Sequence, residues 1–373
     1  MLVEEGKRPE AKRRSLGSSR WALWRTFGSR ARGRRHWGPL LKVAVVAITV
    51  IFSYVALSHI RLGQAWKALG SSNYWWLIPA LVAFGLGCVA RALRWRSLFT
   101  PHRRPSRGVT LNAMMIGYFY NNLLPARAGE AARVLVLKQR SSSPPVEITG
   151  TIVLERIFDV LGILAIFFVA QPWLPGVSWF STAAIVAVAL MVAIAISAAV
   201  LAFYGDRPLR LLLRPFRRWF PVSEERLERA VAELVHGLSG LRDWRVATEA
   251  LSWTLIAWLF SMLCAYFVIV AFHFKLPFAA GVLVMVAIGM SMILPSAPAA
   301  VGVFEGATLI ALNAYGLGHS VALPYALVLH LVNFVPFVLV GFFLLHHNSR
   351  HPRPTVDRQP DIPSSAFLVE EPR

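Results

Sequence analysis

Long apolar runs constrain this chain more than any other feature of its 373 residues. Blocks near the ~20 residues that a helix needs to cross a bilayer recur along most of the sequence. Apolar residues make up 56% of the chain and charged residues 16%, whereas soluble domains carry about 25% charged residues. Because lipid offers no water to backbone polar groups, such runs are expected to be helical. We therefore predict an all-α polytopic membrane protein.

Six runs are long enough to be full transmembrane helices, at residues 40–58, 74–95, 148–170, 181–204, 247–272 and 321–345. Arg91, Arg94 and Arg96, at the end of the second run, are expected at a membrane interface. Residues 1–38 and 346–373 lack apolar periodicity, which is typical of disordered tails. The predicted transmembrane domain therefore covers residues 39–345.

The formal net charge of +20 comes from basic clusters at residues 7–35, 91–107 and 207–245, each beside an apolar run. This interleaving is typical of cytoplasmic loops under the positive-inside rule, and it argues against a nucleic-acid-binding protein. We expect a cytoplasmic-membrane protein with both termini in the cytoplasm and anionic lipid head groups against its basic loops. The loop at 205–245 also has apolar residues at helical spacing, which predict an amphipathic helix.

Two shorter runs, 110–124 and 278–294, are each interrupted by a proline and followed by a second short segment, 131–138 and 307–315 respectively. Short length and proline predict helices that stop within the bilayer. If the basic loops share one side, residues 110–138 must enter and leave from the cytoplasm and residues 278–315 from the outside. The sequence thus predicts two oppositely oriented re-entrant hairpins, an inverted repeat of the kind that forms substrate sites in transporters.

The run at 148–170 contains Glu155, Arg156 and Asp159. Each charge costs about 2.5–3.5 kcal/mol near the centre of a membrane, so this helix needs partners. Glu155 and Asp159 share one helix face, and Arg156 can pair with Asp159 three residues further on. Ionisable residues within a span commonly mark substrate or ion pathways, which makes this region the candidate site.

Candidate residues for substrate binding and translocation come from the two interrupted segments, the charged helix and the last span. They are Asn121, Asn122, Pro125, Arg127, Glu130, Arg133, Glu155, Arg156, Asp159, Pro298, Gly302, Glu305 and His330. In one interpretation, Arg127, Arg133 and Arg156 bind a lipid phosphate through their guanidinium groups, and the carboxylates orient them or exchange protons. In the alternative, the charges form an internal ion-pair cluster that only ties the helix to the hairpin.

Other chemistry has little support in the sequence. Cys88 and Cys264 lie in apolar runs, and no nucleotide-binding, zinc-binding or nucleophile motif occurs. We therefore expect no enzymatic activity, cofactor or metal. Glu305 lies within Gly302-x-x-x-Gly306, a spacing that is typical of close helix packing.

Three motifs resemble those of a known family, the transmembrane region of lysylphosphatidylglycerol synthases and their stand-alone flippase-like relatives. They are Asn-Asn-x-x-Pro-x-Arg-x-Gly-Glu-x-x-Arg at 121–133, Glu-Arg-x-x-Asp at 155–159 and Pro-x-x-Val-Gly-x-Phe-Glu at 298–305. The resemblance extends over about residues 40–345 and implies a polytopic bundle with re-entrant helices that moves a lipid across the cytoplasmic membrane. This family often has Pro-Gly where the chain has Pro298-Ala299, so the second hairpin is expected to turn less sharply. Full synthases add an aminoacyl-transferase domain, whereas 28 polar residues follow Leu345 here, so we do not expect lysyl transfer.

The leading hypothesis is a lipid translocator for an anionic or aminoacylated phospholipid or another lipid-linked head group. A first alternative is a membrane-embedded enzyme or accessory subunit in the synthesis of lipid-linked sugars or isoprenoid lipids, with Glu155 and Asp159 as acid and base. A second alternative is a membrane scaffold whose basic loop recruits soluble partners. Assembly into a homo-oligomer is compatible with all three.

Overall fold

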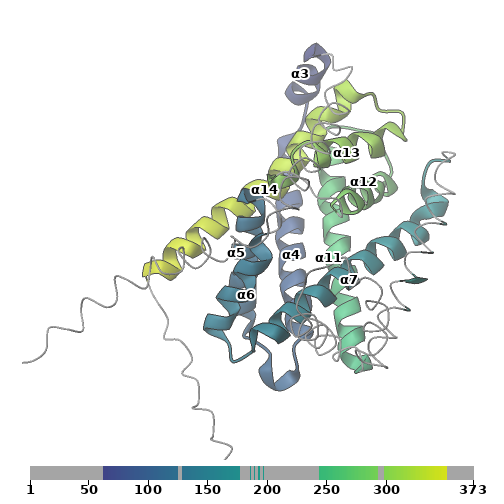
Figure 1. The fold of residues 1–373 in the computed structure, drawn as a ribbon. Helices are drawn as coiled ribbons and strands as arrows, with labels where there is room; N and C mark the ends of the chain where they lie inside the picture. The colour runs from purple at the N-terminus through teal and green to yellow at the C-terminus, as the bar shows by residue number, and fades with distance from the viewer. Residues whose placement is uncertain are drawn as a thin grey trace, which may run out of the picture. The chain divides into compact units, whose positions relative to one another are not determined.

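The computed structural model describes residues 62–124, 128–176, 243–292 and 298–350, together with five single positions between 185 and 196. All four stretches belong to one compact unit, residues 48–373. The described residues contain no strand, as predicted (Figure 1). Their elements are α3 (Leu62–Gly70), η3 (Tyr74–Trp76), α4 (Leu77–Ser97), η4 (Pro101–Arg103), α5 (Arg107–Leu123), α6 (Ala128–Arg140), α7 (Pro145–Ala170), η5 (Gln171–Trp173), α11 (Trp244–Ala271), α12 (Phe278–Ser291), η8 (Pro298–Ala300), α13 (Val303–Asn313) and α14 (His319–Arg350).

Three segments are long and apolar enough to cross a membrane: Tyr74–Ser97, Trp244–Ala271 and His319–Asn348. They confirm the helices predicted at 74–95, 247–272 and 321–345. Large apolar side chains such as Leu81, Leu255 and Leu331 are exposed on their outer faces. Lipid would cover these faces, because contiguous apolar surface of this extent is unusual on a soluble monomer. A multi-pass membrane location is thus supported.

Several predictions fall on parts of the chain that the structure does not describe. The span at 40–58, the tail at 1–38 and residues 351–373 of the predicted tail lie outside the described residues, as do nearly all of the span at 181–204 and most of the loop at 205–245. These remain predictions. The predicted disordered tail began at residue 346, but α14 continues as a helix through Arg350.

Helices α4 and α11 form an antiparallel pair at the centre of the bundle (Figure 1). At one end, the backbone N–H of Asn73, just before η3, donates to the carbonyl of Ala271, 2.8 Å away. At the other end, Arg104 contacts Glu249 at 3.0 Å. We call the second end the arginine-rich end, because α4 finishes there with Arg94 and Arg96 and the following turn adds Arg103 and Arg104.

Helices α5 and α6 form the first of two helix pairs and start and finish at the arginine-rich end. Arg140 at the end of α6 donates to Asn112 near the start of α5 (3.4 Å), and Asn348 at the end of α14 donates to the same Asn112 (3.1 Å). The sequence predicted arms at 110–124 and 131–138. The helices begin three residues earlier, because Ser106 caps α5 by accepting the N–H of Val109.

Helices α12 and α13 form the second pair, which attaches at the opposite end. Helix α12 follows the end of α11 after six residues, and α13 leads within a short turn to the start of α14. The two helices pack on each other, and the turn η8 between them packs against α5. The two pairs therefore meet inside the bundle through η8 and α5. The predicted arms at 278–294 and 307–315 correspond to helices at 278–291 and 303–313.

Two glycines let α5 and α6 approach closely, and this contact positions the candidate site. A Cβ on Gly129 would lie 1.9 Å from the carbonyl oxygen of Gly117, and a Cβ on Gly117 would lie 2.3 Å from Cγ of Arg133. Asn121 Oδ1 accepts the backbone N–H of Gly129 at 2.8 Å, near the start of α6. Asn121 thus closes the helix pair, and its predicted contact with substrate stays a prediction.

Candidate functional site

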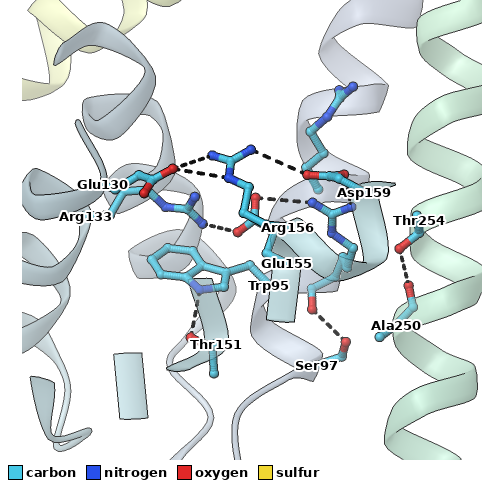
Figure 2. A network of polar contacts seen from close by, with 12 residues as sticks. Trp95, Ser97, Glu130, Arg133, Thr151, Glu155, Arg156, Asp159, Ala250 and Thr254 are labelled. Carbon is cyan, nitrogen blue, oxygen red and sulfur yellow. Dashed lines mark hydrogen bonds and ion pairs between the residues drawn. The ribbon is translucent and has the colours of Figure 1, made fainter. Parts of the chain in front are cut away.

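Six charged side chains from α4, α6 and α7 form one connected network, which we call the charged cluster (Figure 2). Its members are Arg94, Glu130, Arg133, Glu155, Arg156 and Asp159. Five of the six were predicted site residues, so the structure brings together the charges of the 130–133 segment and the 155–159 segment. The cluster contains three arginines and three carboxylates, so its formal charge sums to zero. Neutrality reduces the cost of placing these groups among apolar helices.

Glu155 forms the inner part of the cluster with two arginines. Its Oε2 accepts from Arg133 Nη2 at 2.5 Å, and its Oε1 lies 3.2 Å from Arg94 Nη2. All three side chains are 1% exposed, so these charges are fully removed from solvent. Breaking a buried pair of this kind by removing one partner costs about 3–5 kcal/mol, because the other charge is left uncompensated.

Trp95 fixes Arg133 from the other side. The guanidinium carbon of Arg133 lies 3.9 Å from the centroid of the Trp95 ring, which is a close cation–π contact. The indole N–H of Trp95 donates to Thr151 Oγ1 at 3.1 Å, as Figure 2 shows. Arg133 is thus held on one face by an aromatic ring and at its end by Glu155.

Arg156, Glu130 and Asp159 form the outer part of the cluster. Arg156 donates to Glu130 Oε1 from Nη2 at 2.9 Å and from Nε at 3.2 Å, and its Nη1 lies 3.6 Å from Asp159. Asp159 also accepts from Arg94 Nη1 at 2.5 Å, which links the outer part to the inner part. The side chains of Arg156 and Glu130 are 37% and 31% exposed, so this pair can exchange partners.

These contacts show the partners of two arginines that the sequence could not supply. Arg133, a predicted phosphate contact, is buried and bound by Glu155 and Trp95. Arg94, which the sequence suggested for a membrane interface, is completely buried within the protein and bridges Glu155 and Asp159. The sequence did indicate that another helix must supply a cation, because Glu155 and Asp159 lie on one face of α7 and α7 itself supplies only Arg156.

A second polar group lies at the turn of the other helix pair. Glu305 Oε2 accepts the backbone N–H of Gly302 at 2.7 Å, and Glu305 Oε1 lies 2.5 Å from His330 Nδ1. His330 Nε2 lies 3.0 Å from the carbonyl oxygen of Ala299. We call Ala299, Gly302, Glu305 and His330 the tip cluster. Phe304 stacks on the His330 ring at 4.5 Å between centroids.

The turn at residues 298–302 is sharp, contrary to the expectation from Ala299. Ala299 and Ala300 have φ values of 58° and 57°, and Gly302 has a φ of 81°. Ala299 therefore adopts the left-handed conformation that a glycine favours, at a cost of about 1–2 kcal/mol for an L-residue. The contact to His330 and the close packing of the turn hold the alanine in this conformation.

The remaining predicted residues are only partly described. The Nδ2 atom of Asn122 is buried and has no hydrogen-bond partner among the described residues. Pro298 begins η8. Pro125 and Arg127 lie outside the described residues. Within the part of the chain that is described, no three His, Cys, Asp or Glu side chains gather as a metal-ligand set.

Comparison with known proteins agrees with these motifs. A UPF0104 membrane protein of Methanocaldococcus jannaschii is 23% identical over 238 residues, which are 62% of this chain and 95% of that protein. A UPF0104 membrane protein of Methanothermobacter thermautotrophicus is 22% identical over 317 residues, 77% of this chain and 91% of that protein. Glycosyltransferase AglD of Haloferax volcanii is 28% identical over 122 residues, 32% of this chain and 20% of that protein. Residues 40–341 match the lysylphosphatidylglycerol synthase TM region, and the chain belongs to this family.

Proposed function

We propose that the protein moves a lipid between the leaflets of the cytoplasmic membrane, with the outer part of the charged cluster as the contact for the head group. The observation that carries this proposal is a partly exposed ion pair, Arg156–Glu130, inside a bundle with apolar outer faces. Charges that serve only to hold helices together gain nothing from exposure. A polar head group, by contrast, needs a charged surface it can reach.

The two helix pairs would act as re-entrant hairpins in this proposal. Tyr118 on α5 contacts Phe337, with ring centroids 4.5 Å apart, and Phe337 contacts Phe84 on α4 at 4.9 Å. Phe84 lies in the interior of α4, and α5 ends five residues after Tyr118. This supports a first pair that turns back at depth rather than crossing. Non-helical backbone at that depth is tolerated only where it is buried in protein or lines a wet cavity.

Arg156 is the group best placed to bind a phosphate. An incoming phosphate could replace Glu130 on the two donors of Arg156 that now contact one carboxylate oxygen. Glu130 would then be free to pair with a cationic part of the head group, such as the ammonium of an aminoacylated lipid. Arg94, Arg133 and Glu155 would remain in place and hold α4, α6 and α7 together. The substrate class is therefore an anionic, aminoacylated or otherwise lipid-linked head group.

The enzymatic alternative has weaker support. Glu155 and Asp159 would have to act as acid and base, but each is ion-paired to two arginines. Those contacts would have to break before either carboxylate could exchange a proton with a substrate. The match to the glycosyltransferase covers one fifth of that protein and carries no chemistry to this chain by itself.

Reconstitution tests the proposal. Protein is placed in vesicles that contain trace fluorescent lipids with anionic, aminoacylated or sugar-bearing head groups, and a membrane-impermeant reductant quenches the outer-leaflet label. For at least one head group, we expect the reductant to quench more fluorescence than the fraction of labelled lipid in the outer leaflet, because lipid from the inner leaflet is moved outward. Glu130→Gln should slow the additional loss of fluorescence. Glu249→Gln removes a carboxylate that is paired with Arg104 at the arginine-rich end, and it should not change the rate. Quenching equal to that of protein-free vesicles for every head group would overturn the proposal.

A further inference from the structure

The hydrogen bonds of the tip cluster specify its proton content. The Ala299 carbonyl can only accept, so His330 Nε2 must carry a proton to bond it at 3.0 Å. A distance of 2.5 Å between His330 Nδ1 and Glu305 Oε1 also requires a proton between the two atoms, since two lone pairs would repel. The pair therefore holds one proton more than a carboxylate beside a neutral imidazole. This is true whichever of the two atoms carries it.

Loss of that proton would break one side of the tip cluster. A neutral His330 that keeps its Nε2 proton on Ala299 would present a lone pair to the Glu305 carboxylate. If the ring moved its proton to Nδ1 instead, the bond to Ala299 would be lost. Either way, a net negative charge would remain in a site whose carboxylate side chain is only 8% exposed.

The turn that His330 holds is under backbone strain. Ala299 and Ala300 both adopt the left-handed conformation, which L-residues disfavour. His330, on α14, bonds directly to the strained residue, and η8 packs against α5 of the other helix pair. Release of this bond would therefore let the turn relax at the place where the two pairs meet.

We propose that Glu305 and His330 form a proton-operated latch that fastens the turn at 298–302 to α14 when the proton is bound and releases it when the proton leaves to water. If the protein moves lipid as proposed above, the same latch would couple this movement to a proton gradient; this second step rests on the proposed function. The other titratable groups on the elements packed against this site make no described contact with Glu305 or His330. Helix α12 has none, and α13 has only Glu305. Helices α3, α4 and α11 also pack against α14, and they carry Lys67, Cys88, Arg91, Arg94, Arg96, Arg245, Glu249, Cys264 and Tyr266. Helix α5 carries Arg107, Tyr118 and Tyr120. Within two turns of His330, α14 carries only Tyr325, which donates to the carbonyl of Ala265.

Cysteine accessibility measures the latch without requiring transport. Cys88 and Cys264 are replaced by alanine, and a single cysteine is placed at Ala300, which is buried, or at its exposed neighbour Val301. A membrane-permeant maleimide labels each variant in vesicles between about pH 5 and about pH 9, a range that spans the ordinary titration of histidine. Because a buried thiol ionises at higher pH than an exposed one, the same two cysteines are also labelled in a His330→Leu background, and the wild-type ratio is divided by the ratio in that background at each pH.

The ratio should rise about tenfold or more towards high pH, the size of shift expected for loss of a charge-assisted hydrogen bond. Glu305→Gln should keep the ratio low at every pH, because the amide can donate to a neutral His330 Nδ1 and still accept from Gly302. In the His330→Leu background, the undivided ratio should be high already at low pH. A wild-type ratio that changes less than about twofold, or a Glu305→Gln variant with the full wild-type response, would refute the latch. A pH response in vesicles that move no lipid would refute the proposed function and leave the latch standing.

Discussion

The inner part of the charged cluster predicts a double-mutant cycle in which the second substitution restores much of the stability that the first one removes. Among the described residues, Arg133→Met leaves Glu155 with Arg94 as its one ion-pair partner, and Glu155→Met leaves Arg133 buried against Trp95 without a paired carboxylate. Each single variant gives the cluster a net charge of one unit in a fully buried position. We expect each to lower the free energy of unfolding by about 3–5 kcal/mol.

The double variant Arg133→Met/Glu155→Met should be more stable than either single variant. It removes one charge of each sign and leaves the Arg94–Asp159 contact of 2.5 Å intact, so the cluster is neutral again. Two methionine side chains of similar length fill most of the vacated space, and replacing a buried ion pair by apolar groups is often neutral or stabilising. We therefore expect the double variant to lie within about 1–2 kcal/mol of the wild type, with a coupling energy of several kcal/mol.

Reversible unfolding in mixed micelles or bicelles measures these free energies for the full chain. The matched control is the pair Arg104–Glu249 at the arginine-rich end, whose side chains are 20% and 39% exposed. Glu249→Met should cost less than about 1 kcal/mol. Arg104→Met should cost more, because Arg104 also donates to the carbonyl groups of Ser97 and Phe99, but the coupling between the two substitutions should still be small. The reasoning fails if the two inner substitutions are individually mild, or if their effects simply add in the double variant.

Three further predictions concern packing and backbone. Gly129→Ala should destabilise the protein by about 1–3 kcal/mol or more, because the new Cβ would clash with the carbonyl of Gly117. Gly85→Ala is the control: its Cβ would have no neighbour within 4 Å, and it should be neutral or stabilising. Thermal unfolding measures both variants, and equal effects would contradict the close approach of α5 and α6. Ala299→Gly should stabilise the fold by about 1 kcal/mol. Glycine relieves the strain of the left-handed backbone, and this gain exceeds the cost of its greater conformational entropy in the unfolded chain. A destabilised variant in the same unfolding assay would refute the strain. Trp95→Phe should cost about 1–2 kcal/mol of unfolding free energy through loss of the bond to its hydroxyl partner and a weaker cation–π contact, and an unchanged value would count against both contacts.

The sequence predicted the helices well and the partners of the charges less well. Apolar length identifies α4, α11 and α14 because lipid and helix geometry leave a long apolar run few other structures. The pairing of Arg156 with Asp159 was also predictable, since spacing within one helix places them together. Arg94 was assigned to the interface because its position near a helix end matches the positive-inside pattern, and only the packing of α4 on α7 shows that it faces inward.

The tip cluster shows the same limit from the other direction. Glu305 and His330 are 25 residues apart on different helices, and no spacing rule joins them. The presence of Ala299 in place of the family's glycine suggested a less sharp turn, because alanine disfavours the left-handed backbone conformation. Residue type alone does not show the contacts that can hold an alanine in that conformation. The bond from His330 and the packing of η8 on α5 keep the glycine-like backbone in place.

The order of the charges along the chain has a consequence for membrane insertion. Arg94, Glu130 and Arg133 all precede Glu155, Arg156 and Asp159, so a ribosome finishes the partners before it makes the helix that needs them. Helix α7 would be a poor substrate for insertion by itself, because its charges have no compensation in lipid. Once a nascent chain has reached Ala170, it holds every member of the cluster and can neutralise α7 by packing it against helices already made. The charged cluster can therefore form before α11 is synthesised, so neutralisation of α7 does not depend on the second half of the chain.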